Sequence, residues 1–168
     1  IQVNNYSILA SQVLVPPAME AILSDEHNQI DAFLAAGHVC TIMGMNAYYP
    51  VAEKYRTPIV VTGFEPVDLL QGILMAVTQL ETGKHKVENQ YSRAVNQAGN
   101  TLAQQAIDKV FAISDRSWRG LGNIPVSGYE VNTQYKKYNA RIKFALGINE
   151  EQENTVCIAG AIMKGLKK

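Results

Sequence analysis

Two short stretches of the sequence carry side chains that could bind a metal ion or transfer protons. The first, 37–40, contains His38 and Cys40, whose alternate spacing after an apolar run could aim an imidazole and a thiol at one face, toward a soft metal or a redox partner. The second contains the carboxylates Glu65 and Asp68, which could hold a cation or shuttle protons beside the histidine. These residue types indicate a metal site or an acid–base site.

The same four side chains also have ordinary structural explanations. His38 could hydrogen-bond a backbone carbonyl, and Cys40 could fill a small apolar gap, as most buried cysteines do. Glu65 and Asp68 flank Pro66 near the start of a predicted helix, where acidic groups complement the positive helix end by about 0.3 to 1 kcal/mol. The residue types alone leave both explanations open.

The segments that must position these residues are predicted by the alternation of short β-branched runs with longer stretches of helical period. Such alternation is typical of an α/β layered fold with a mainly parallel sheet flanked by helices. The expected strands are 6–9, 30–36, 58–62, 87–91 and 111–113, with strand and turn over 118–128. The expected helices are 17–23, a segment after Gly37 that runs through 49–55, 66–81, and a segment after Asn100.

The best-defined of these helices is 66–81. Its apolar residues recur at i, i+3, i+4 and i+7, namely Leu70, Ile73, Leu74 and Val77. This spacing predicts one stripe that is buried against the sheet. Ligands of open α/β sheets bind beyond the carboxyl ends of the strands, so the residues directly after each predicted strand are the first candidates for a site.

A third group of polar residues surrounds the start of the helix after 100: Asn89, Tyr91, Arg93, Asn96 and Asn100. These side chains could line a pocket. Residues of these types more commonly supply helix caps and turns, which is the interpretation we adopt from the sequence.

Composition excludes several classes of function. Lys and Arg together number 15 and Asp and Glu together number 15, so no net charge attracts nucleic acid or an anionic membrane surface. The two cysteines, Cys40 and Cys157, lie far apart, which gives no zinc knuckle or disulfide framework and predicts a reducing, cytoplasmic location. No apolar run approaches the roughly 20 residues of a membrane span. The Walker, G-x-S-x-G and H-E-x-x-H motifs do not occur.

Five strings resemble the HypD family of nickel-iron hydrogenase maturation proteins, in the family's order: AAGHVCTIMG, PIVVTGFEPVDLLQGI, VENQYSRAV, AGNTLAQ and DRSWRGLGNIPVSGYEV. The resemblance covers nearly the whole chain and implies a Rossmann-like topology. It implies that 1–147 is the second α/β domain of such a protein, with 1–24 as a linking strand and helix from the preceding domain. The remaining segment, 148–168, would be a linker and the start of the iron-sulfur region.

The resemblance also implies a function and partners. HypD-like proteins act with HypC as the scaffold on which the Fe(CN)2CO unit is assembled, with cyanide arriving from HypE and HypF. This chain would be a fragment of such a scaffold, with HypC and HypE as partners and with the preceding α/β domain and the iron-sulfur region of the same protein as neighbours. Neither nucleic acid nor a membrane is implied.

Residues of the site follow from the matched motifs. The strings around His38 and Glu65 match motifs of the second domain, which implies that His38, Glu65 and Asp68 are cleft residues that support the iron without ligating it. Cys40, in the same matched string as His38, is a further candidate for this cleft. Arg119 is a further cleft candidate, because its planar guanidinium fork suits an anionic group or a neighbouring domain.

Metal ligation is expected elsewhere. The family's N-terminal C-G-x-H-x-H motif, whose cysteine is thought to hold iron, has no counterpart here. Cys157 falls where the family's C-terminal cysteines begin, so it is a candidate ligand of a 4Fe-4S cluster in the full-length protein only. We therefore expect this fragment to hold neither the cluster nor the Fe(CN)2CO iron, and to be inactive alone.

Two alternatives come from other classes of function. The chain could be a stand-alone small-molecule enzyme of α/β fold in which His38 is a general base and Glu65 or Asp68 is its partner. It could also be a pure docking domain for HypC or HypE, in which case His38 and Cys40 are structural.

Overall fold

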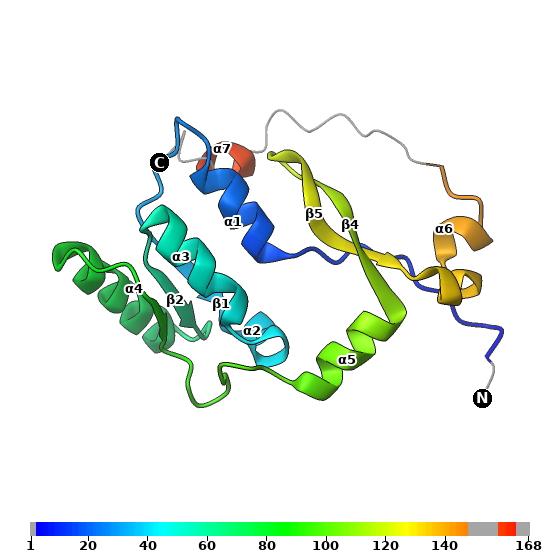
Figure 1. Ribbon diagram of the computed structural model, residues 1–168, viewed down its shortest axis with the longest axis horizontal. Coiled ribbons are helices and arrows are strands. Elements are labelled where there is room, and N and C mark those ends of the chain that lie inside the picture. Colours follow the sequence, from blue (N-terminus) through cyan, green and yellow to red (C-terminus); the bar gives the residue numbers. More distant parts are fainter. Residues whose placement is uncertain (1–2, 148–157, 164–168) are drawn as a thin grey trace. The chain divides into compact units, whose positions relative to one another are not determined.

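A computed structural model of the 168-residue chain describes residues 3–147 and 158–163 (Figure 1). The chain divides into two compact units. We call Leu23–Gln105 the central unit, and Ile1–Ile22 together with Ala106–Lys168 the split unit. Helix α5 (Thr101–Val110) crosses from the first into the second. None of the described helices combines the length and the hydropathy that a membrane crossing needs.

The central unit is built on a parallel sheet of β1 (Phe33–Ala36), β2 (Ile59–Thr62) and β3 (Val87–Asn89) in the order β1-β2-β3. Phe33 pairs with Ile59, and Ile59 pairs with Val87 on the other side. The central strand β2 is the β-branched run Ile-Val-Val-Thr, and it forms the core of the sheet, because Ile59, Val60 and Val61 are 0% exposed. The fold is α/β and Rossmann-like, as the sequence predicts.

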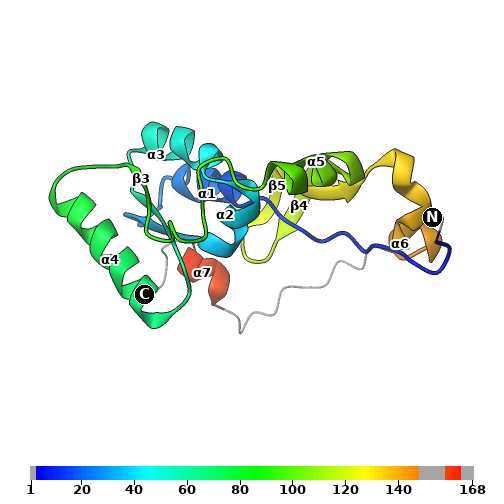
Figure 2. The same ribbon diagram turned by 90° about the horizontal axis from the view of Figure 1, so that it is seen from below.

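Helices cover both faces of this sheet (Figures 1 and 2). Helix α4 (Pro66–Glu81) packs against β1 and β2. Helix α2 (Gly37–Met43), the short 3-10 helix η1 (Asn46–Tyr48) and helix α3 (Tyr49–Tyr55) lie on the other side, where α2 contacts β2. The predicted bounds of α4 and the end of β2 are confirmed.

The predicted orientation of α4 is wrong. Its buried side consists of Asp68, Gly72, Ala76 and Gln79, whereas the stripe expected to face the sheet is exposed. The reason is that the sheet side carries small residues: a Cβ added at Gly72 would lie 2.9 Å from Thr62 Cγ2. The helix therefore approaches β2 closely through its small side, and its large apolar residues point away.

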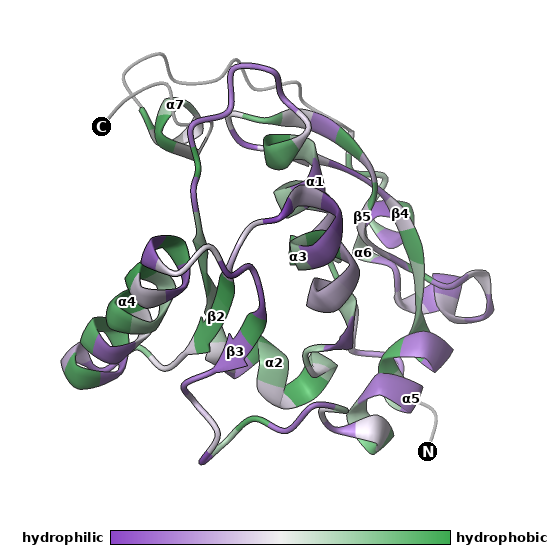
Figure 3. Ribbon diagram, turned by 60° about the vertical axis from the view of Figure 1, so that its left-hand side comes forward, coloured by the Kyte–Doolittle hydropathy of each residue, from purple (hydrophilic) through white to green (hydrophobic). Residues whose placement is uncertain are grey.

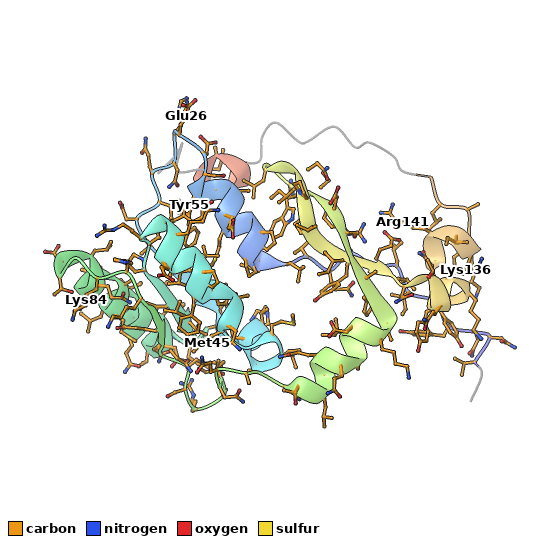
Figure 4. All side chains as sticks on the ribbon, in the orientation of Figure 1. Glu26, Met45, Tyr55, Lys84, Lys136 and Arg141 are labelled. Carbon is orange, nitrogen blue, oxygen red and sulfur yellow. The ribbon has the colours of Figure 1, made fainter. Side chains whose placement is uncertain are left out.

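A single helix after Gly37 is also not formed. Gly44 ends α2 with a φ of +72°, and a Cβ there would lie 2.4 Å from Gln97 O, so only glycine fits. The next residue, Met45, which is labelled in Figure 4, is buried. Its N–H donates to Gln97 O at 2.9 Å. The chain then resumes as η1 and α3.

The split unit contains an antiparallel hairpin of β4 (Phe111–Trp118) and β5 (Gly122–Val131), with a register shift between Ser114 and Arg116. This confirms strand and turn over 118–128 and extends the strand predicted at 111–113. The strand predicted at 6–9 is not formed; Ile8 makes one isolated parallel bridge to Asn139.

The other elements of the split unit are helical. They are α1 (Val15–Leu23), which begins two residues before the predicted start, the 3-10 helix η2 (Thr133–Tyr138), α6 (Ala140–Lys143) and α7 (Ala159–Met163). Asn132 caps η2 and Asn139 caps α6, each by accepting a backbone N–H at its side-chain oxygen. Most of the segment 148–168 lies outside the described residues.

Candidate functional site

Three chain segments meet at the edge of the central sheet where its parallel strands end. Each strand leads directly into one of them: β1 into 37–38, β2 into 63–65 and β3 into 90–93. Carboxyl ends of parallel strands share one edge, which is the usual place of ligands in such sheets. We call the group formed by these segments and the first turn of α4 the strand-end cluster; it comprises Gly37, His38, Gly63, Phe64, Glu65, Asp68, Gln90, Tyr91 and Arg93.

Asp68 is the buried acid of the cluster. Its side chain is 6% exposed and accepts hydrogen bonds from Arg93 Nη1 at 2.8 Å, Arg93 Nη2 at 2.5 Å and Gln90 Nε2 at 2.8 Å. The hydrogen bonds from Arg93 are the main cause that lowers the pKa of this carboxyl far below its usual range. Asp68 is therefore ionised at neutral pH, and its oxygens are used to hold Arg93 and Gln90.

Tyr91 fills the space between the turns that follow β1 and β2. A Cβ added at Gly37 would lie 2.6 Å from Tyr91 Cδ1, and a Cβ added at Gly63 would lie 2.8 Å from Tyr91 Cε2. The guanidinium carbon of Arg93 lies 4.4 Å from the centroid of the same ring, a cation–π contact. One aromatic ring thus sets the spacing of both turns and supports the arginine that holds Asp68.

His38 and Glu65 are the exposed members of the cluster. Glu65 precedes α4, its side chain is 64% exposed, and its Oε2 lies 3.4 Å from Arg93 Nη2. His38 is exposed, and its ring lies 5.1 Å from that of Phe64 at an angle of 44°. Among the described residues, no carboxylate lies within ion-pair distance of His38. His38 is therefore accessible to a ligand or partner at this edge.

Cys40 does not join His38 at this edge. The thiol is 0% exposed, and burial raises its pKa while a hydrogen bond with the Tyr48 side chain partly opposes this rise. The expectation that both side chains face one way is wrong, because α2 already begins at Gly37. Residues two apart on a helix point in nearly opposite directions, so His38 faces out and Cys40 faces in.

The two remaining candidates are Arg119 and Cys157. Arg119 is exposed in the turn between β4 and β5 and belongs to the split unit. Cys157 lies outside the described residues. The part of the chain that the structure describes has no group of three His, Cys, Asp or Glu side chains that could hold a metal ion. Its one thiol, on Cys40, does not fit a cluster that needs four thiolates.

Three of the five matched strings contain the turns of this cluster. Comparison with known proteins gives the family. A family model described as "HypD: Hydrogenase formation hypA family" matches residues 1–168. The chain belongs to the HypD family.

Several curated relatives of the HypD family match almost the whole chain. Hydrogenase maturation factor HypD2 of Bradyrhizobium diazoefficiens is 42% identical over 99% of this chain and 46% of its own length. HypD of Azotobacter vinelandii is 40% identical over 97% of this chain and 45% of its own. HypD of Escherichia coli is 40% identical over 97% and 44%. The chain thus spans somewhat under half the length of these relatives.

Sequence reasoning missed the structural role of Tyr91 and Arg93, which it assigned to caps and turns, and did not single out Gln90. Asn96 and Asn100 do act that way: their Oδ1 atoms accept the N–H of Gly99 and Ala103 at 2.8 and 3.0 Å. A signal for Gln90, Tyr91 and Arg93 was available, because they lie at or just after the end of the predicted strand 87–91 and belong to the HypD-like string VENQYSRAV.

Proposed function

We propose that this chain is part of a cytoplasmic HypD-type scaffold that assembles the Fe(CN)2CO unit of nickel-iron hydrogenase together with HypC, and that receives cyanide from HypE. Membership of the HypD family supports hydrogenase maturation as the process. The observation that carries the site is the strand-end cluster, where matched segments from three strands gather exposed and buried polar side chains at one edge. The iron is the substrate of this assembly, and its ligands belong to other parts of the full-length protein.

The chemistry of the cluster suits the support of a cyanide-bearing iron. An imidazole offers one N–H donor and one acceptor nitrogen when neutral, so His38 hydrogen-bonds a cyanide nitrogen. Glu65 supplies an exposed negative charge that favours a divalent iron. Asp68 and Arg93 compensate each other's charge and act by holding the loops in place rather than by touching the iron.

Rigidity of the edge is as important as its charge. Cyanide and carbon monoxide need a preorganised site with few donors, and a donor on a mobile loop would not select one orientation. Tyr91 between two glycines, together with the two hydrogen bonds from Arg93 to Asp68, provides that rigidity in the central unit. Arg119 and Cys157 stay predictions, as does a 4Fe-4S cluster in the full-length protein.

A stand-alone acid–base enzyme is less well supported. Such an enzyme needs His38 hydrogen-bonded to Glu65 or Asp68, and Asp68 is instead engaged by Arg93 and Gln90. Its lowered pKa also makes it a poor base at neutral pH. A pure docking role for HypC or HypE predicts that His38 is not needed for the support of the iron. The following experiment distinguishes this role from the proposed one.

The test is an infrared spectrum of the full-length protein purified anaerobically with HypC. His38→Ala should remove or shift the bands of iron-bound cyanide and carbon monoxide while HypC still co-purifies. His27→Ala is the matched control, because His27 is an exposed loop histidine outside the cluster. Unchanged bands in His38→Ala would show that the imidazole does not support the iron and would favour the docking role.

A second measurement concerns the chain by itself. Purified anaerobically, it should contain well under one iron per chain and show no absorbance of an iron–sulfur cluster. Stoichiometric iron would contradict the proposal that the ligands lie elsewhere in the full-length protein.

A further inference from the structure

Helix α4 carries an apolar face that nothing in the central unit covers. The large hydrophobic residues on it are Val67, Leu70, Ile73, Leu74, Val77 and Leu80. Leu70 is 67% exposed and Leu74 is 65% exposed, although the opposite side of the same helix is packed on the sheet. Figure 3 shows hydrophobic residues along α4. A helix that packs on its sheet through one side and carries large apolar residues on the opposite side is typical of a position between two layers of a protein.

A groove runs along this face beside the first strand of the sheet. It has a volume of about 300 Å³ and is lined from the strand side by Ile30 and Leu34 and from α4 by Ile73, Ala76, Val77 and Leu80. Its walls are mainly apolar, with Gln29 and Asp31 as the polar exceptions. An occupant that buries them must itself be apolar and long enough to follow the helix.

The edge of β1 that borders this groove is open. Among the described residues, β1 pairs with β2 alone. Phe33 N–H donates toward β2, to Pro58 O at 2.9 Å. Backbone groups alternate in direction along a strand, so the N–H and C=O of Leu34 point to the open edge. An unpaired strand edge beside an uncovered apolar helix is the place where a parallel sheet usually continues.

We propose that the sheet continues past β1 in the full-length protein, and that a strand and an apolar helix from the polypeptide which HypD relatives carry beyond the matched stretch fill this groove and cover α4. The length of the relatives supports this occupant, because more than half of each lies outside the match. The scarcity of charge supports it too, because Glu81 at the last position is the one charged residue among the exposed residues of α4, and the six large apolar side chains fit a permanent internal contact.

Hydrogen exchange at two neighbouring amides tests the strand. The protein to use is a full-length chimera in which this chain replaces the matched stretch of the Bradyrhizobium relative, compared with the chain alone by mass spectrometry at single-residue resolution. The Leu34 amide should exchange about 100-fold more slowly in the chimera. The Phe33 amide, already bonded to Pro58, is the internal control and should be protected in both. An equally fast Leu34 amide in a chimera that protects Phe33 would overturn the proposal.

Charged substitutions test the helix face. Leu70→Glu with Leu74→Glu should leave the isolated chain as stable as before, because both side chains are exposed, and should lower the melting temperature of the chimera. Leu102→Glu is the matched control, since Leu102 is 76% exposed on α5, and it should change neither. Equal melting temperatures of the chimera with and without the double substitution would contradict the proposal.

Co-expression of two separate polypeptides answers the question without the chimera. The rest of the Bradyrhizobium relative should co-purify with the wild-type chain and with Leu102→Glu, and recovery should fall at least tenfold with the double variant. Equal recovery with all three would overturn the proposal. A second result would also overturn the proposal: the chain alone forms a dimer, the double substitution abolishes this dimer, and the rest of the relative does not displace it. A second copy of the chain would then be the occupant of the groove.

Discussion

Arg93 holds Asp68 through both terminal nitrogens of its guanidinium group, one to each carboxylate oxygen. The two residues are 25 positions apart, so this pair ties the segment after β3 to the first turn of α4. Such paired, charge-assisted hydrogen bonds fix orientation as well as distance. The Asp68 carboxylate is nearly buried and the Arg93 side chain is half exposed, which makes the acid the fixed partner.

The first prediction concerns the pH dependence of this pair. A carboxyl whose pKa is lowered on folding adds stability above its unfolded pKa of about 4 and loses that contribution as pH falls further. Asp68→Asn should therefore be less stable than wild type at pH 7, and the difference should shrink below about pH 4. Urea unfolding at pH 7 and pH 3 measures this, with exposed Asp31→Asn as the control that should match wild type. A difference that stays constant down to pH 3 would contradict the ion pair.

The second prediction tests the packing of Tyr91. A Cβ at Gly37 would lie 2.5 Å from Thr62 O and 2.6 Å from the Tyr91 ring, so Gly37→Ala forces both to move. Overpacking of this kind costs about 1 to 3 kcal/mol in the free energy of unfolding. Gly147→Ala is the control, because nothing lies within 4 Å of its added Cβ. Equal unfolding free energies for the two variants would show that the turn after β1 is not packed as described.

Much of this site was accessible from the sequence, and the reasons for the failures are physical. Apolar runs and helix signals placed His38 and Glu65 correctly after two neighbouring strands. The pairing of Asp68 with Arg93 was not predictable, because it depends on a contact between distant segments. The opposite directions of His38 and Cys40 follow from where α2 begins, a boundary that a run such as Ala35-Ala36-Gly37 does not specify.

The orientation of α4 failed for a different reason. The large apolar residues of the helix form one stripe and the opposite side is small or polar, so periodicity identifies the helix but favours the wrong side for the contact with the sheet. In the structure the side of α4 that carries Gly72 and Ala76 packs on the sheet.

The third prediction tests this orientation. Ala76→Asp should lower the free energy of unfolding by more than about 3 kcal/mol because it buries a charge, whereas Leu74→Asp should change it by less than about 0.5 kcal/mol. Chemical denaturation of both variants decides, and the reverse order would restore the sequence-based orientation.

The fourth prediction is a stabilising substitution. Arg56 caps α3 in the left-handed region, with a φ of 52°, and its side chain is exposed. Glycine adopts this conformation without a Cβ penalty, so Arg56→Gly should raise the free energy of unfolding by about 0.5 to 1 kcal/mol. Arg56→Ala removes the same side chain but keeps the Cβ, so it should give no such gain. A gain of equal size in both variants would trace the effect to the arginine side chain instead of the backbone.

The fifth prediction is that Cys40 is chemically inert in the folded chain. The thiol has no exposed surface and burial raises its pKa, so both access and thiolate fraction are low at pH 8. Alkylation of the Cys40 peptide by iodoacetamide, followed by mass spectrometry, should be at least about 100-fold slower in the native chain than in urea. Tyr48→Phe removes the hydroxyl that bonds the thiol and should leave this protection almost unchanged, because burial is the larger cause. Rapid labelling of Cys40 in the native chain would contradict its burial and would support the expectation that it faces the same way as His38.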